Sequence, residues 1–358
     1  MTTEALPVAS PPLQPEDLIP RPRVEQPSPR VARSNQDTIR ALVEEIGCSE
    51  IGVPTQLEQT VRIDSGTGTK QLRTRGTIPF RGHEHALLLT EPYQQEANPN
   101  SRLMLRLPGL GEVAAHGTSA NLHDVLATHY AQDTTLTIGT EGVGKDSSKL
   151  GLLRGLTMSA EEMAATRLVL ARSFAQGRPT RIQATSMGTM IASHMAEINA
   201  SAKILDVEEY MLLATAIISR RFNLARDMGI LFMPHVIKDS WRQVKQMPEG
   251  ALSPAILSEM FDGMFVGAYA GNIRNLLKVT PQHRLDALTG TNKVSVVNGD
   301  RDPLRQTHMW RRQQRHDLGN VALRFIPHIG HGLAVNHLMS GAELINTSEQ
   351  FESRAVAD

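Results

Sequence analysis

A pentapeptide near the middle of the chain has the residue pattern of an exposed nucleophile. Ser186 lies in Ala-Thr-Ser-Met-Gly at 184–188, between a β-prone run at 181–185 and an apolar, helix-compatible stretch at 187–198. A serine between small outer residues, at a sharp turn from a strand into a helix, projects its Oγ into the open. The small residues let the two backbones pass close together, and the residue after the serine turns its N–H toward the same space. The pattern therefore predicts a nucleophilic Ser186.

A serine hydroxyl is a weak nucleophile unless a neutral imidazole takes its proton and an acid orients that imidazole. Both partners occur downstream. Gly-Asp-Arg-Asp-Pro at 299–303 follows a β-prone run at 294–298, and Phe-Ile-Pro-His-Ile-Gly at 325–330 leads into His331. Each segment stands just past the carboxyl end of a predicted strand, where open α/β sheets place their sites. We therefore expect the acid and the histidine base to come from these two segments.

The segments that must position these side chains alternate between strand-like and helix-like patterns. The strand candidates are 59–63, 70–74, 86–90, 103–107, 135–138, 181–185, 209–214, 292–298 and 322–326. Between them, 120–130 suits a helix, and Ser159 with Glu162 forms a capping box that opens another, which Gly177 and Pro179 close. Such alternation is typical of an α/β fold with a mostly parallel sheet and helices on both faces.

The chain divides into a tail, one large domain and an insertion. Residues 1–33 hold eight of the 20 prolines and few apolar residues, so we expect a disordered tail. Residues 34–358 suit one α/β domain. Within it, 217–285 interrupts the alternation with helix-rich sequence, which predicts a helical cap. An apolar stripe there packs in the core or forms a lid over an acyl pocket; it comprises Leu257, Met260, Phe261, Met264 and Phe265.

Composition argues against several classes of function. Lysine plus arginine and aspartate plus glutamate both number 37, so no basic excess favours binding to nucleic acid or an anionic membrane. Cys48 is the only cysteine, which excludes an intrachain disulfide and a thiolate metal site and favours a buried or inert thiol. No apolar run approaches the ~18 residues of a membrane span. Residues 1–20 lack the basic head and apolar core of a secretory signal, so we expect a cytoplasmic protein.

From about Ala86 to Leu338 the chain resembles the α/β-hydrolase family. That family has a nucleophile elbow, then Gly-x-x-Asp after a strand, then a later Gly-His, with serine, acid and histidine in this order. Carried over by position, the resemblance implies Ser186 as nucleophile, Asp302 as acid and His331 as base. It also implies an α/β-hydrolase-like sheet with an inserted helical cap.

The resemblance further implies an oxyanion hole made of two backbone N–H groups. Pro108-Gly109-Leu110 follows a predicted strand and matches the family's His-Gly-x turn, in which x supplies one N–H. Leu110 and Met187 are then the two donors. The chain departs from the family pattern at Pro108, where histidine is common, and at Ala184, where glycine is usual. Two strand residues are also unusually polar for a central strand, Arg181 and Gln183.

Each assignment has a rival in the sequence. Asp300 competes with Asp302, which the resemblance favours because it is the third residue after the glycine that ends the strand. His328 and His337 compete with His331, which is favoured by the glycine before it and by its interval of 29 residues from Asp302. Taken singly, the serine also fits a helix N-cap and the aspartate a turn.

These residues together imply a hydrolase that cleaves a carboxylic ester or thioester of a small-molecule acyl substrate. The serine would form an acyl-enzyme, and neither a metal nor an organic cofactor is required. Chain composition gives no reason to expect a nucleic-acid partner, and the oligomeric state is not predicted.

Two other interpretations remain open. Gly109 and Gly111 belong to Gly-Leu-Gly-Glu-Val-Ala, which fits the Gly-x-Gly-x-x-Ala turn of a dinucleotide-binding oxidoreductase, with Glu141 as the acid that holds the ribose. Alternatively, the chain keeps an α/β-hydrolase-like fold but is a catalytically silent binding protein, since a fold does not guarantee chemistry.

Overall fold

The computed structural model describes residues 41, 44–63, 69–93, 101–109, 112, 114, 117–140, 157–216, 238–239, 241–243, 245–246, 271–272, 274–275, 278, 280–290, 293–302 and 320–355. The expected tail at 1–33 lies outside these residues. So do most of the expected cap at 217–285 and its apolar stripe at 257–265. The tail and the cap therefore stay predictions.

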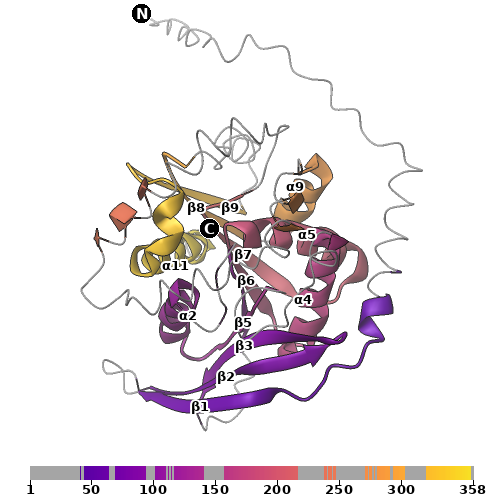
Figure 1. Cartoon of the computed structure of the whole chain (residues 1–358). Helices are drawn as coiled ribbons and strands as arrows, with labels where there is room; N and C mark the ends of the chain where they lie inside the picture. Colours follow the sequence, from indigo (N-terminus) through magenta and orange to yellow (C-terminus); the bar gives the residue numbers. More distant parts are fainter. Residues whose placement is uncertain are drawn as a thin grey trace, which may run out of the picture. The chain divides into compact units, whose positions relative to one another are not determined.

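A nine-stranded sheet runs through the described part of the chain, in the order β1-β2-β3-β5-β4-β6-β7-β8-β9 (Figure 1). The strands are β1 (Thr55–Ile63), β2 (Lys70–Phe80), β3 (His83–Pro92), β4 (Leu103–Leu107), β5 (Thr134–Ile138), β6 (Thr180–Thr185), β7 (Val207–Leu213), β8 (Lys293–Gly299) and β9 (Val321–Ile326). The pairs from β1 to β5 are antiparallel, and every pair from β5 to β9 is parallel. The expected mostly parallel sheet is confirmed.

Helices cover both faces of this sheet (Figure 1). One face carries α2 (Gly117–His129) and α11 (His337–Ala355), and the other carries α4 (Ala160–Ala175), α5 (Met187–Ala202) and α9 (Gln282–Thr289). The strands serve both layers because successive side chains point to opposite faces. In β4, Leu103 and Leu105 pack in the α4 and α5 core, whereas Met104 packs with α2 and α11.

Local sequence features set the ends of α4 as expected. The Ser159 Oγ accepts the backbone N–H of Glu162 at 3.1 Å. Gln176 and Gly177 then adopt left-handed conformations that end the helix. By contrast, α11 has no counterpart among the helix candidates, and α9 runs across residue 285, the expected end of the cap, to pack on α5.

The two unexpectedly polar residues of β6 have buried partners on the face beneath α2 and α11. The Gln183 Oε1 accepts the Arg106 Nε–H at 2.6 Å, and the Gln183 amide donates to the Thr185 Oγ1 at 3.0 Å. The Arg181 Nε lies 3.7 Å from the Glu209 Oε2. Because buried polar groups are costly only when they lack partners, these contacts allow a polar central strand.

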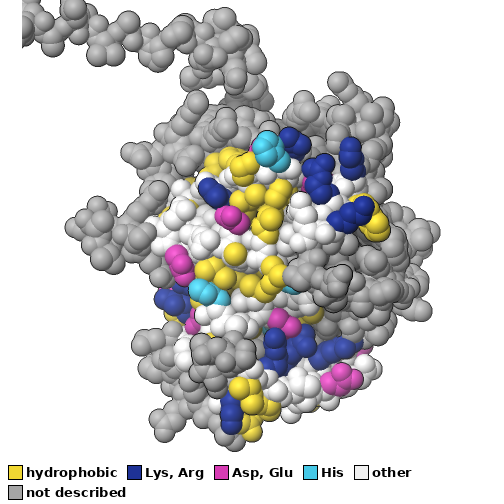
Figure 2. All heavy atoms as spheres, turned by 90° about the vertical axis from the view of Figure 1, so that its left-hand side faces the viewer, with side chains coloured by type: hydrophobic (Ala, Val, Ile, Leu, Met, Phe, Trp, Pro, Cys, Tyr) yellow, Lys and Arg dark blue, Asp and Glu magenta, His cyan; other side chains and the backbone are white. Residues whose placement is uncertain are grey.

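The surface over α2 and α11 is mixed in character. Figure 2 shows apolar side chains down the middle of this face, with acidic and basic side chains beside them. None of the helices among the described residues has the length and the hydropathy needed to cross a membrane.

Candidate active site

The sharp turn between β6 and α5 holds Ser186 in a rare backbone conformation, with φ of 48° and ψ of −115°. A non-glycine residue held there costs about 1–3 kcal/mol, so its surroundings must compensate. The Ser186 N–H donates to the Leu213 carbonyl at 2.9 Å, which extends the ladder of β7. The Ser186 carbonyl accepts the Thr189 N–H at 2.9 Å and the Thr189 hydroxyl at 2.6 Å. The turn is thus fixed from both sides.

Close approach of α5 to β4 explains the glycine after the turn. A Cβ on Gly188 would lie 2.3 Å from the Leu107 carbonyl oxygen and 2.9 Å from that of Pro108. The small residue on the strand side, Ala184, meets no such limit, because its methyl group is buried in the core shared with α4 and α5. Alanine in place of the usual glycine therefore fits at 184, and the strict requirement falls on 188.

The loop after β8 delivers Asp302 in a single turn. The Asp302 N–H donates to the Gly299 carbonyl at 3.3 Å, an i to i+3 bond that closes this turn. Gly299 is itself crossed by the chain that follows β9, because a Cβ on it would lie 2.2 Å from the Ile329 carbonyl oxygen. These contacts give a physical reason for the three-residue spacing from glycine to aspartate.

Ser186, His331 and Asp302 form one hydrogen-bonded row. The Ser186 Oγ lies 2.7 Å from the His331 Nε2, and the His331 Nδ1 lies 2.7 Å from the Asp302 Oδ2. Asp302 is 2% exposed and His331 is 8% exposed, whereas Ser186 is partly exposed. The carboxylate can only accept at Nδ1, so Nε2 is left to accept the serine proton. The residues come from the ends of β6, β8 and β9.

The rival histidines lie elsewhere. His328 occupies an exposed turn with φ of 62°, and its Nδ1 is 2.9 Å from the Arg301 Nη2. His337 opens α11. Asp300 shares the turn with Asp302, but it is Asp302 that contacts the imidazole.

The electrostatic surroundings favour the charged form of His331. Burial alone would lower its pKa, but the Asp302 carboxylate opposes burial, and Glu112 and Asp239 add to its effect, so the pKa lies above the ordinary value. An imidazolium formed during proton transfer would therefore be stabilised at this position.

Glu112 belongs to the turn after β4, and none of the patterns described above points to it. Its Oε2 accepts the Gly109 N–H at 2.7 Å, and its own N–H donates to the Gly109 carbonyl at 3.2 Å. Burial raises the pKa of Glu112, and Arg106, the Gly109 N–H and His331 act in the opposite direction. The reciprocal pair of bonds closes the turn after β4 in the way a capping box closes a helix start, so a glutamate three residues after the turn glycine was the available signal.

Of the two expected oxyanion donors, the structure describes Met187 but not Leu110. Met187 is the first residue of α5, so its N–H lies at the positive end of the helix dipole, beside the serine. Leu110 lies outside the described residues. The neighbouring Gly109 passes close to the nucleophile, since a Cβ on it would lie 3.2 Å from the Ser186 Cβ.

The contacts of Gly109 disfavour the dinucleotide interpretation. Its N–H is bound by a carboxyl oxygen of Glu112, where a pyrophosphate would need a free donor. In the dinucleotide motif the glycine turn also opens a helix, but α2 starts only at Gly117. Gly111 and Glu141 lie outside the described residues. Within the described part of the chain, no group of three or more potential metal ligands occurs.

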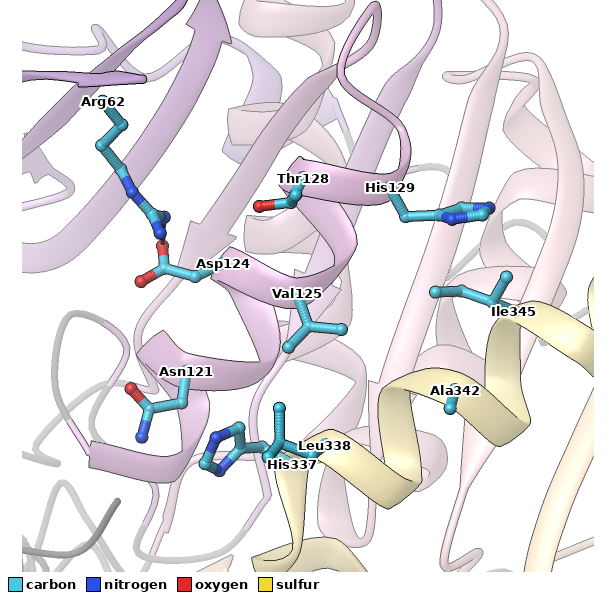
Figure 3. A pocket seen from close by; sticks show the side chains of 10 residues that line it. All are labelled: Arg62, Asn121, Asp124, Val125, Thr128, His129, His337, Leu338, Ala342 and Ile345. Atoms are coloured by element: carbon cyan, nitrogen blue, oxygen red, sulfur yellow. Dashed lines mark ion pairs between the residues drawn. The ribbon is translucent and has the colours of Figure 1, made fainter. Parts of the chain in front are cut away.

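A groove of about 550 Å³ lies between α2 and α11 (Figure 3). Its lining residues are Arg62, Asn121, Asp124, Val125, Thr128, His129, His337, Leu338, Ala342 and Ile345. At one side, the Arg62 Nη1 pairs with the Asp124 Oδ1 at 2.6 Å. Ser186, Asp302 and His331 are absent from this lining, so the groove is not where the serine would act.

No protein-family model matches the chain, and no curated protein matches it in sequence. Solved structures match its fold. The thioesterase domain from the curacin biosynthetic pathway aligns with a TM-score of 0.52 at 16% identity, over 76% of this chain and 99% of that one. A serine hydrolase involved in carbazole degradation aligns with a TM-score of 0.53 at 15% identity, over 78% of this chain and 99% of that one. A mutant epoxide hydrolase from Solanum tuberosum aligns with a TM-score of 0.54 at 13% identity, over 78% of this chain and 99% of that one.

These structures share the α/β-hydrolase fold, and the chain has this fold. At such identities the similarity establishes the fold alone, because one fold hosts many activities.

Proposed function

We propose that the protein is a serine hydrolase that cleaves a carboxylic ester or thioester through an acyl-enzyme. The observation that carries the proposal is the row from Ser186 through His331 to Asp302, with 2.7 Å at each step. Nucleophile and base within hydrogen-bond reach, with the base oriented by an acid, is the arrangement that activates a hydroxyl group. The strained turn under the serine supports the same role, since strain of this kind gathers at functional sites.

Acylation would begin with proton transfer. The His331 Nε2 takes the hydroxyl proton while the Ser186 Oγ attacks the acyl carbon, and the Asp302 carboxylate stabilises the imidazolium through Nδ1. The carbonyl oxygen becomes an oxyanion, which the N–H groups of Met187 and Leu110 would hold. The imidazolium then protonates the leaving alcohol or thiol as its bond to the acyl carbon breaks.

Deacylation would repeat these steps with water. The His331 Nε2 removes a proton from water, whose oxygen attacks the ester carbon of the acyl-Ser186. Collapse of the second oxyanion releases the carboxylic acid and returns the proton to the serine oxygen. Every proton is thus carried by one imidazole, without a metal or an organic cofactor.

The structural neighbours support hydrolase chemistry in general. They include proteins described as a thioesterase, a serine hydrolase and an epoxide hydrolase. The ester or thioester is our choice among these because an activated serine forms an ester with an acyl group, an intermediate that water can cleave.

A fluorophosphonate probe tests the proposal directly, because it reacts with activated serines. We expect the wild type to gain one covalent phosphonate and Ser186→Ala to gain none. Ser201→Ala is a matched control: it lies in the last turn of the same helix, about 22 Å along the axis at about 1.5 Å per residue. Among the described residues its Oγ contacts the local Glu197 carbonyl, at 3.4 Å, so its labelling should equal that of the wild type.

Hydrolysis of p-nitrophenyl esters of increasing acyl length then measures activity and the preferred chain. A correctly folded wild type that neither reacts with the probe nor cleaves any ester would refute catalysis and leave the binding-protein interpretation.

A further inference from the structure

The loop that carries His331 is held by the carboxylate of Asp239, which lies in the segment predicted to form a cap. The Asp239 Oδ2 accepts the Gly330 N–H at 3.0 Å and the Gly332 N–H at 2.8 Å. These are the backbone groups immediately before and after the histidine. A single oxygen thus fixes the backbone on both sides of the proposed base, across more than ninety residues of sequence.

Glycine at 330 makes room for this carboxylate. A Cβ there would lie 3.0 Å from the Asp239 Oδ2 and 3.3 Å from its carboxyl carbon. Gly330, the glycine before His331, is therefore explained by the close packing of Asp239 against it.

A second contact comes from a residue four positions further along the chain. Gln243 is 1% exposed, and its Oε1 accepts the Asn336 side-chain amide at 3.3 Å. Asp239 and Gln243 thus contact one surface of the protein. That surface is the short helix η3 (His331–Val335), with Asp239 at its start and Gln243 at the residue that ends it.

The geometry points to Asp239 as a positioning residue, which holds the His331 loop so that the imidazole stands between Ser186 and Asp302. This inference rests on the proposed function, because it assigns a role toward the same base. Asp239 binds the backbone N–H groups of the two residues that flank His331, and its negative charge acts on the imidazole. Among the described residues, the ionisable groups that act on the imidazole are Asp302 from the loop after β8, Glu112 from the turn after β4, and Asp239; all three raise its pKa.

Two substitutions separate the hydrogen bonds from the charge. Asp239→Asn keeps an oxygen that can accept both N–H groups but removes the negative charge. Asp239→Ala removes both. Asp286→Asn is the matched control, since it removes a carboxylate that lies on the exposed side of α9 and contacts Gln282 at 2.9 Å.

We expect Asp239→Ala to lower kcat by between about tenfold and about a hundredfold with little change in KM, since a displacement of about 1 Å at a reacting group costs about 10²-fold. Asp239→Asn should retain most of kcat, but the acid limb of its kcat/KM profile should move to lower pH, because the histidine loses a stabilising negative charge. A purely structural role would leave that limb in place. Asp286→Asn should change neither quantity.

NMR titration of the His331 ring makes the test independent of turnover. The ring resonance is assigned as the one that His331→Gln removes, and its midpoint should fall in Asp239→Asn but not in Asp286→Asn. Failure of the proposed function would appear as absent labelling of Ser186 while this midpoint still falls. An unchanged midpoint in Asp239→Asn, together with wild-type kcat in Asp239→Ala, would overturn the role of Asp239. Should Asp239→Ala fail to fold, the midpoint and the acid limb of Asp239→Asn decide alone.

Discussion

The tight crossing of α5 over the end of β4 predicts a large effect from one methyl group. In Gly188→Ala the new Cβ would start 2.3 Å from the Leu107 carbonyl oxygen and 2.9 Å from that of Pro108. Ordinary contact distances are about 3.5 Å, so the closer contact must open by roughly 1 Å. The atoms in the way belong to the backbone, which cannot rotate aside as a side chain can.

That displacement should appear in both stability and rate. Overpacking a close-packed site costs about 1–3 kcal/mol, and we expect the upper end because two backbone groups are struck. The shift also moves the loop through Gly109 relative to Ser186. With about 10²-fold lost for about 1 Å of misplacement, kcat/KM should fall by about two orders of magnitude.

Urea unfolding and p-nitrophenyl ester hydrolysis measure the two effects on one preparation. Gly47→Ala is the control, since a Cβ at that glycine meets nothing within 4 Å. It should retain the wild-type rate and the same or a slightly higher unfolding free energy. Wild-type stability together with wild-type turnover in Gly188→Ala would refute the argument from close packing.

Three further outcomes follow from the site and the sheet. Asp302→Asn should reduce kcat by about 10⁴-fold, because the amide no longer fixes the productive tautomer; retained activity in a stopped-flow ester assay would remove Asp302 from the mechanism. Since the pKa of His331 is raised, and only its neutral form can act as base, the acid limb of kcat/KM should lie above pH ~6.5; a limb below that value would contradict the shift. Glu209→Ala removes a buried carboxylate that accepts hydrogen bonds from two serine hydroxyls and faces Arg181. Urea unfolding should therefore show a free energy of unfolding lower by about 3–5 kcal/mol, and a decrease below about 1 kcal/mol would contradict this.

Much of the fold could be predicted because its signals are local. The strand at 103–107 is predicted with its observed bounds, since a central parallel strand buried on both faces leaves a nearly continuous apolar run. The start of α5 is predicted at Met187 because a turn between small residues separates strand from helix. Ser186, Asp302 and His331 could be predicted for a related reason, because each is close to the carboxyl end of a recognisable strand.

The missed elements depend on contacts that no local pattern reports. The helix α11 holds three serines and one each of asparagine, threonine and glycine among its 19 residues. These are weak helix formers, and the helix is stabilised by packing on α2 and β8. A Cβ on Gly341 would lie 2.5 Å from the Val125 Cγ1, so even its glycine is explained by the neighbouring helix. Asp239 binds residues more than ninety positions away, and nothing in its own neighbourhood marks it as part of a site.

The order of the strands also shows why a loop must bring His331 to Ser186. Ser186 follows β6 and His331 follows β9, three strands apart, which is about 14 Å at about 4.8 Å per strand. The 2.7 Å contact between them therefore requires the chain after β9 to run back across the sheet edge. It does so over Gly299, where the Ile329 carbonyl occupies the space that a side chain would need. The Arg301 N–H donates to that same carbonyl at 2.9 Å, so one crossing point places the histidine and holds the turn of Asp302 beside it. The glycine that ends β8 is thus a condition for the proposed base and acid to meet.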